Sequence, residues 1–193
     1  MDPAKHIDAV VAQGLAPLLK SQGFAKAGRS FHRRRGDRWQ VVNVQASSGN
    51  SAAQARFTLN LGLYIPQIEV LAGQPPLQGK PKEYECTLRE RIGALMPQAR
   101  DHWWTLVPDS EPATLAAELA EAFAAYGLPW LEGHADLAEV AASLAEAPTI
   151  LAAAAALAAG DREAAARRIE HMKAERPRAT AVAEAWAAKH LRA

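Results

Sequence analysis

The sequence predicts an α+β protein, in which an antiparallel sheet of about five strands packs against helices and is followed by an α-helical C-terminal extension. Two observations carry this prediction. Residues 57–65 read Phe-Thr-Leu-Asn-Leu-Gly-Leu-Tyr-Ile, an unbroken alternation that is typical of a strand with one buried face and one open face. After Pro112, alanine, the best helix former, makes up about a third of the chain.

The first half of the chain predicts one helix and then three strands. Asp2 and Pro3 suit a helix start, because a carboxylate caps free N–H groups and proline fits the first helical position. Apolar residues then recur at helical spacing as far as Gly23. The strand-like runs that follow are 24–35, 38–47 and 55–65, and their short connections predict an antiparallel meander.

The segment 66–83 contains four prolines and two glycines, which argues against regular structure and predicts a long loop. Residues 86–92 and 102–107 predict the fourth and fifth strands. Trp103 and Trp104 would face opposite sides of the last strand, so we expect one in the core and the other against a helix or the open face. We expect Trp130 where the first tail helix turns back.

Glycines and prolines punctuate the rest of the chain and predict its helices. An α+β domain is therefore expected over residues 1–131, and an alanine-rich helical extension over residues 132–193. The helices are predicted near 112–126, 136–146, 148–159, 162–175 and 178–191.

Composition favours a soluble, cytoplasmic protein. Apolar residues make up 49% of the 193 residues, and the single cysteine, Cys86, cannot form an internal disulfide. The N-terminus lacks the features of a secretory signal, and no apolar run is long enough to span a membrane.

The net charge of +1 conceals an asymmetry. Residues 1–100 carry 14 Lys and Arg against 7 Asp and Glu, whereas residues 101–193 carry 8 against 14. Such a division could recruit a nucleic acid to the basic half, or the two halves could attract each other within one fold. The second interpretation needs no partner, and we favour it.

The open face of the sheet is the predicted binding site. If the polar residues of the second, third and fourth strands share this face, it is rich in amide and guanidinium groups but has no nucleophile or base. This composition predicts a non-enzymatic module that binds a protein or a small anionic ligand, in an oligomeric state that the sequence leaves open. The expected contact residues are Arg33, Asn43, Gln45, Thr58, Asn60, Tyr64, Arg89 and Arg91.

Two alternative functions stay open at this point. A hydrolase or transferase acting on a small anionic substrate would use His32 or His102 as its base, in a pocket that also holds Arg89 or Arg91. Nucleic-acid binding would use the basic first hairpin, although alternation separates its cations and few aromatic residues accompany them. Those cations are Lys26, Arg29, Arg33, Arg34, Arg35 and Arg38.

No cofactor, metal site or catalytic residue is predicted. The six histidines stand far apart, and the sequence has no phosphate-binding loop and no nucleophile elbow. Cys86 is interpreted as a small buried residue.

A series of short segments stands out by its order along the chain: 18–24, 31–33, 42–45, 57–62, 86–92 and 103–104. This series resembles the bacterial family known as domain of unknown function 4304. The likeness covers roughly residues 5–131 and implies a helix, meander and helix domain, but no substrate or catalytic residue. Separately, the stretch 157–165, with Gly160 and Asp161 between two helical runs, resembles the turn of a tetratricopeptide-type hairpin, which predicts a partner-binding appendage.

Overall fold

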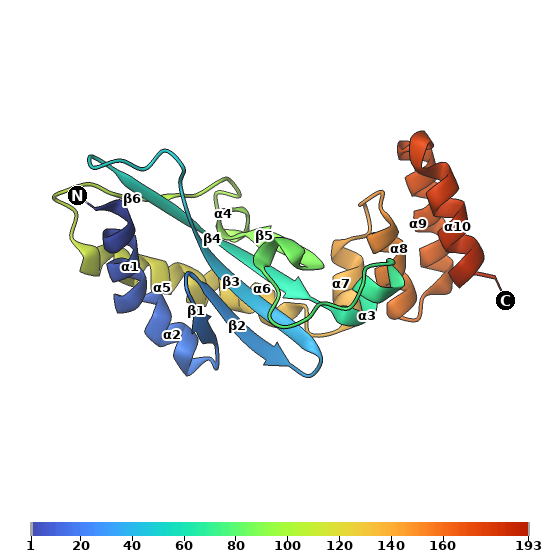
Figure 1. Ribbon diagram of the computed structural model, residues 1–193, viewed down its shortest axis with the longest axis horizontal. Coiled ribbons are helices and arrows are strands. Elements are labelled where there is room, and N and C mark those ends of the chain that lie inside the picture. The colour runs from blue at the N-terminus through green and yellow to red at the C-terminus, as the bar shows by residue number, and fades with distance from the viewer. Residues whose placement is uncertain (1, 193) are drawn as a thin grey trace. The chain divides into compact units, whose positions relative to one another are not determined.

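The computed structural model describes residues 2–192 and divides the chain into two compact units (Figure 1). The sheet unit comprises residues 2–64 and 79–132, and the helical unit comprises residues 65–78 and 133–192. The chain thus leaves the sheet unit after residue 64, contributes a short segment to the helical unit and returns at residue 79.

The sheet unit is built on a six-stranded antiparallel sheet. Strands β1 to β5 are neighbours in chain order, while β6 pairs with β4 beside β5. The predicted α+β class and meander are therefore confirmed. The strands are β1 (Ala25–Ala27), β2 (Ser30–Arg35), β3 (Arg38–Ala46), β4 (Ala55–Tyr64), β5 (Leu88–Arg91) and β6 (Trp104–Leu106).

Two single elements expected near the N-terminus are each divided at a glycine. The run 24–35 forms the β1–β2 hairpin, because Gly28 adopts a φ of 62° in the turn between the strands. The first helix is divided into α1 (Pro3–Gln13), which Asp2 caps as predicted, and α2 (Leu15–Ser21). The division falls at Gly14, where a side chain would collide with the carbonyl oxygen of Ala116.

The helix after β6 does not turn back at Trp130, contrary to our expectation. Helix α5 (Pro112–Ala122) continues through a π-helical turn (Phe123–Gly127) into α6 (Leu128–Gly133). In that turn the N–H of Leu128 donates to the carbonyl of Phe123. The wider turn lets the helix continue past Pro129, which has no N–H and would crowd the preceding α-helical turn.

Both faces of the sheet are covered within this unit. On the helix face, α1 packs against β4, and α5 packs against α1. This face holds the apolar core, which includes Ile7, Val10, Phe31, Val42, Val44, Phe57, Leu59, Leu61, Leu63 and Leu119.

The opposite face, which we call the strap face, is covered in part by residues 79–87, the strap. The strap includes a 3₁₀ turn (Glu83–Glu85), and its Cys86 lies so close to Gly62 that a Cβ there would be 2.6 Å from the sulfur. At its other end the carbonyl of Pro81 accepts a hydrogen bond from Nε2 of His32 (2.9 Å). The expectation of an open face is wrong for β4, since every residue of this strand except Arg56 is buried.

The helical unit contains α3 (Pro66–Leu71), α7 (Leu137–Ser143), α8 (Ile150–Ala158), α9 (Arg162–Glu175) and α10 (Thr180–His190). The expectation that residues 66–83 are irregular is wrong for the first part of this segment, which forms α3. Pro66 occupies the first turn of that helix, where a missing N–H is harmless. Small side chains make up much of the core of this unit, since Ala152 to Ala156 of α8 are all buried. Between α8 and α9, Gly160 has a φ of 87° and Asp161 caps α9, which gives the predicted helical hairpin.

Candidate functional site

Strand register determines which predicted site residues share a face. Asn43 pairs with Asn60 and Asn60 with Arg91, while Gln45 pairs with Thr58. The same registers place Tyr64 and Arg89 on the strap face, so seven of the eight predicted residues lie on it.

Arg33 is the exception, because it lies on the helix face with only 4% of its surface exposed. Its Nε donates to Oε1 of Gln40 (2.6 Å), NH1 donates to the carbonyl of Gln22 (2.9 Å), and NH2 forms an ion pair with Glu132. Burial lowers the pKa of Arg33, and the hydrogen bond to Glu132 opposes that shift. These partners fasten α6 to the sheet.

Cations of the first half also meet acids of the second half elsewhere. Arg35 lies 3.9 Å from Glu132, and Arg91 lies 2.8 Å from Asp101. These contacts agree with an attraction between the two halves within one fold.

Three residues of the strap face have local partners. Asn43 donates to Ser30 (2.9 Å), and Arg89 donates to both carboxylate oxygens of Glu83 (2.8 and 3.3 Å). Tyr64 is 5% exposed. Their side chains are thus occupied or covered in this structure.

The remaining predicted residues meet around Arg91. Its Nε donates to Asn60 (3.2 Å), its NH2 to Gln45 (3.3 Å) and its NH1 to Asp101 (2.8 Å). Asn60 also donates to Gln45 (2.7 Å), which closes a ring of hydrogen bonds between three strands. Thr58 lies in the same register, and its hydroxyl is buried with no hydrogen-bond partner among the described residues.

Two aromatic and charged contacts extend this network to the surface. Nε1 of Trp103 donates to Asp101 (2.6 Å), so a single carboxylate fixes both the indole and the guanidinium of Arg91. The guanidinium carbons of Arg56 and Arg91 each lie 5.5 Å from the centre of the Trp103 ring. We call Arg56, Arg91, Asp101 and Trp103 the guanidinium–indole patch. The hydrogen bond from Arg91, followed by that from Trp103, lowers the pKa of Asp101.

Of the four patch residues, only Arg91 is among the contact residues that the sequence predicts. The expectation for the tryptophan pair is confirmed, since Trp104 is buried against Phe57 (5.7 Å between ring centres) and Trp103 lies on the strap face. Asp101 lies two residues before Trp103, and this spacing was an available signal that they share a face. Arg56 alternates with Thr58 and Asn60, which also made it detectable.

The histidines do not form the pocket that the enzymatic alternative requires. His32 is 6% exposed, donates to Pro81 through Nε2, and has no partner at Nδ1 within the described chain. A cleft of about 190 Å³ adjoins His102, but its lining residues include neither Arg89 nor Arg91. In residues 2–192 no group of three or more His, Cys, Asp or Glu side chains could hold a metal ion.

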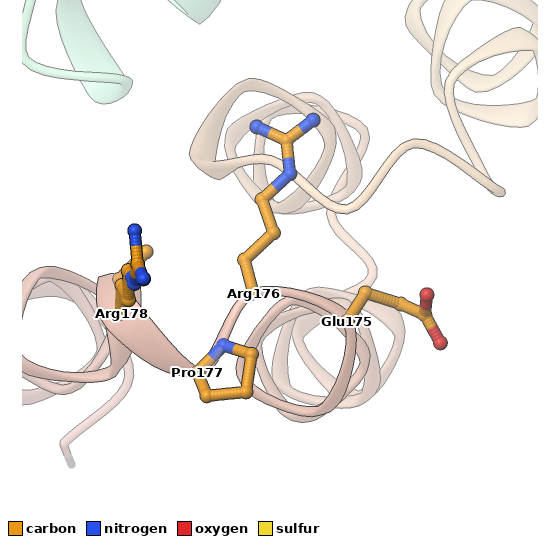
Figure 2. A pocket seen from close by; sticks show the side chains of 5 residues that line it. Glu175, Arg176, Pro177 and Arg178 are labelled. Carbon is orange, nitrogen blue, oxygen red and sulfur yellow. The ribbon is translucent and has the colours of Figure 1, made fainter.

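Two hollows of the helical unit are each lined by two arginines, and a third, of about 450 Å³, adjoins Arg192. The larger of the first two, of about 560 Å³, is lined by residues 175–179 at the α9–α10 turn. Figure 2 shows the Arg176 side chain extending away from Pro177, with Glu175 pointing to another side. The smaller, of about 300 Å³, is lined by Ala145, Glu146, Ala164, Arg167, Arg168 and His171.

Comparison with known families decides the classification. The model of the Domain of unknown function (DUF4304) matches residues 15–133, which is more than half of the chain. The chain belongs to the DUF4304 family. No curated protein and no solved structure gives a significant match.

For this DUF4304 protein the match includes all six strands, α5 and α6, and therefore the whole guanidinium–indole patch. It does not include helices α7 to α10. None of the described helices combines the length and the apolar character needed to cross a membrane.

Proposed function

We propose that this protein is a non-catalytic binding module that holds an acidic segment of a partner protein on the guanidinium–indole patch. The observation that carries the proposal is the placement of two guanidinium groups at 5.5 Å from one half-buried indole ring. Tryptophan and arginine dominate the energetics of protein interfaces, since they combine large contact areas with directional donors.

The patch is held in place before any partner arrives. Arg91 is fixed by Asn60, Gln45 and Asp101, and Trp103 is fixed by the same Asp101. A side chain that is already ordered loses little conformational entropy on binding, so its contacts contribute more to affinity.

Arg56 supplies a charge that forms no salt bridge within residues 2–192 and that acts on Asp101 of the patch only at longer range. It is exposed, and none of residues 2–192 places a carboxylate oxygen within 4.0 Å of its guanidinium. Its fork of donors is therefore available to a carboxylate, which it matches geometrically.

The distribution of charge favours a protein over a nucleic acid. The sheet unit carries 14 Lys and Arg against 12 Asp and Glu, and the whole chain has a pI of about 7.9. Arg29 of the basic hairpin is paired with Asp8 (2.7 Å), and Arg33 is buried. A nucleic-acid surface would instead gather unpaired cations on one face.

Fluorescence anisotropy with a labelled, glutamate-rich peptide tests the proposal. We expect saturable binding that Trp103→Ala and Arg56→Glu each weaken about tenfold, equivalent to about 1.4 kcal/mol. Arg34→Glu is the matched control, because Arg34 also lies over a tryptophan, 5.7 Å from the ring of Trp39, but outside the patch.

The outcomes separate the alternatives. Equal weakening by Arg34→Glu would indicate a diffuse charge effect and overturn the assignment to the patch. Absence of binding to the peptide at about 50 mM salt, with single-stranded DNA binding in its place, would favour the nucleic-acid alternative.

A further inference from the structure

Arg168 of α9 is a partly buried cation without a counter-ion. Its NH1 donates to the carbonyl of Ala152 (2.8 Å), and no carboxylate oxygen of the described chain lies within 4.0 Å of it. Burial lowers the pKa of Arg168, and so does the neighbouring charge of Arg167, whereas Asp161 and Glu146, which lie beyond salt-bridge distance, oppose the shift. Arginine stays charged in proteins. Because burial removes part of its hydration, a negatively charged group bound beside Arg168 would stabilise it.

The smaller hollow of the helical unit lies at this side chain. Arg167 and Arg168 line it from one turn of α9 and His171 from the next, so three nitrogen-bearing side chains share one cleft of about 300 Å³. Across the cleft, Nε2 of His171 donates to the carbonyl of Glu146 (3.4 Å). This contact holds the imidazole at the rim.

The carboxylates near the cleft, those of Glu163 and Glu146, neutralise its arginines only weakly. Arg167 reaches Glu163 at 3.8 Å, but the two side chains are 69% and 92% exposed, so their attraction is small. The Glu146 side chain also lines the cleft and is exposed. Two guanidinium charges therefore face one lining carboxylate.

We propose that this cleft binds a phosphate monoester. A phosphate monoester is close to a dianion at neutral pH and offers three acceptor oxygens, which suits two guanidinium forks. Ala145 and Ala164 give the cleft small walls that leave room for the esterified group. The ester could belong to a small metabolite or to a phosphorylated side chain of a protein.

The larger hollow provides the contrast. Arg176 and Arg178 line it, but both are exposed, so water can hydrate their charges (Figure 2). Of the four arginines that line these two hollows, Arg168 is the one that is partly buried and forms no salt bridge within the described chain. Arg178→Ala is therefore the matched control for the loss of an arginine from a hollow in the same unit.

Isothermal titration of the full-length protein tests this site, with inorganic phosphate, phosphoserine and a sugar phosphate as probes at constant ionic strength. We expect saturable binding that Arg167→Ala weakens about fivefold and Arg168→Lys about tenfold, since lysine keeps the charge but loses the fork. Arg178→Ala should bind as the wild type does. Circular dichroism confirms that each variant is folded.

The three probes identify the source of the phosphate. Tighter binding of phosphoserine than of the sugar phosphate supports a phosphoprotein ligand, and the reverse order supports a metabolite. No saturable binding of any probe up to about 20 mM, or equal binding by the folded Arg167→Ala and Arg168→Lys variants, would overturn the proposal. The guanidinium–indole patch takes no part in this experiment.

Discussion

The two faces of the sheet are covered by different chemistry. On the helix face, Leu59 and Leu61 of β4 are completely buried among apolar side chains of the core. On the strap face, the neighbouring Thr58 and Asn60 are also buried, but their surroundings are a hydrogen-bonded network and a strap. On the helix face, apolar side chains need only non-directional contacts to be buried. On the strap face, each buried polar atom needs a hydrogen-bond partner in the right direction.

The strap face holds two of the three buried side-chain polar atoms that lack a hydrogen-bond partner among the described residues, the hydroxyl of Thr58 and Nδ1 of His32; the third, Nε2 of His102, lies beside Trp104. Such atoms destabilise the fold, so the strap face is the face on which sequence change can increase stability. The comparison leads to four predictions, given from the largest expected effect to the smallest.

Leu61→Ala should reduce the free energy of unfolding by about 3 kcal/mol, since it leaves a cavity in a packed core. Leu61 has no exposed surface on the helix face. Urea denaturation measures the change, and Val107→Ala, at a residue that is 43% exposed, is the control. Equal losses in the two variants would contradict our account of the helix face.

Gly62→Ala should displace the strap and reduce stability by about 2 kcal/mol. The new Cβ would lie 2.6 Å from the sulfur of Cys86 and 2.9 Å from its Cβ. Because Cys86 is the only cysteine, its rate of reaction with a thiol reagent reports strap opening directly. We expect faster labelling in the variant, and an unchanged rate would show that close packing of Cys86 on Gly62 does not hold the strap against the sheet.

Thr58→Val should stabilise the protein by about 1 kcal/mol. The substitution keeps the shape of a completely buried side chain and removes a hydroxyl that has no partner within residues 2–192. Thermal denaturation measures the gain, with Thr105→Val on β6, where the side chain is only partly buried, as the control. A loss of stability would mean that the hydroxyl is hydrogen-bonded after all.

His32 should make stability depend on pH. Burial lowers the pKa of this histidine from its ordinary 6.5, with an opposing effect from the Pro81 carbonyl and a further decrease from Lys80. Below pH 6.5 the unfolded chain therefore binds a proton on His32 more readily than the folded chain does. Stability from this group is complete above pH 6.5 and falls as the pH decreases toward the folded-state pKa.

Urea denaturation between pH 7 and 5 measures the effect as the difference between the wild type and His32→Gln. The wild type should lose more stability as the pH falls, with a slope below about 1.4 kcal/mol per pH unit. His6→Gln, at an exposed site on α1, is the control. Identical curves for the wild type and His32→Gln would remove His32 as the cause.

The helix face was predictable because a single strand encodes it. The alternation of residues 57–65 identified the buried leucines, and the register of β3 and β4 placed the amides of Asn43, Gln45 and Asn60 on the other face as expected. Period-two patterns determine which face a residue occupies. They do not determine what covers that face.

The strap and the patch were less accessible to sequence reasoning. The strap lies in a segment of prolines and glycines, where no periodicity reveals which strand it crosses. Arg33 was expected on the open face but lies on the helix face, where Gln22, Gln40 and Glu132 give it partners from three separate segments. Long-range polar contacts of this kind depend on the tertiary fold.

Helix α3 has a consequence for the family as a whole. The family match includes α3, yet Ile68 of this helix is buried in a cluster with Ala153 of α8 and Ile169 of α9, which lie beyond the match. A chain ended at residue 133 would leave Ile68 without these neighbours. We therefore expect α3 and the C-terminal helices to be inherited or lost together, with tail-less relatives carrying a shorter or more polar β4–β5 connection.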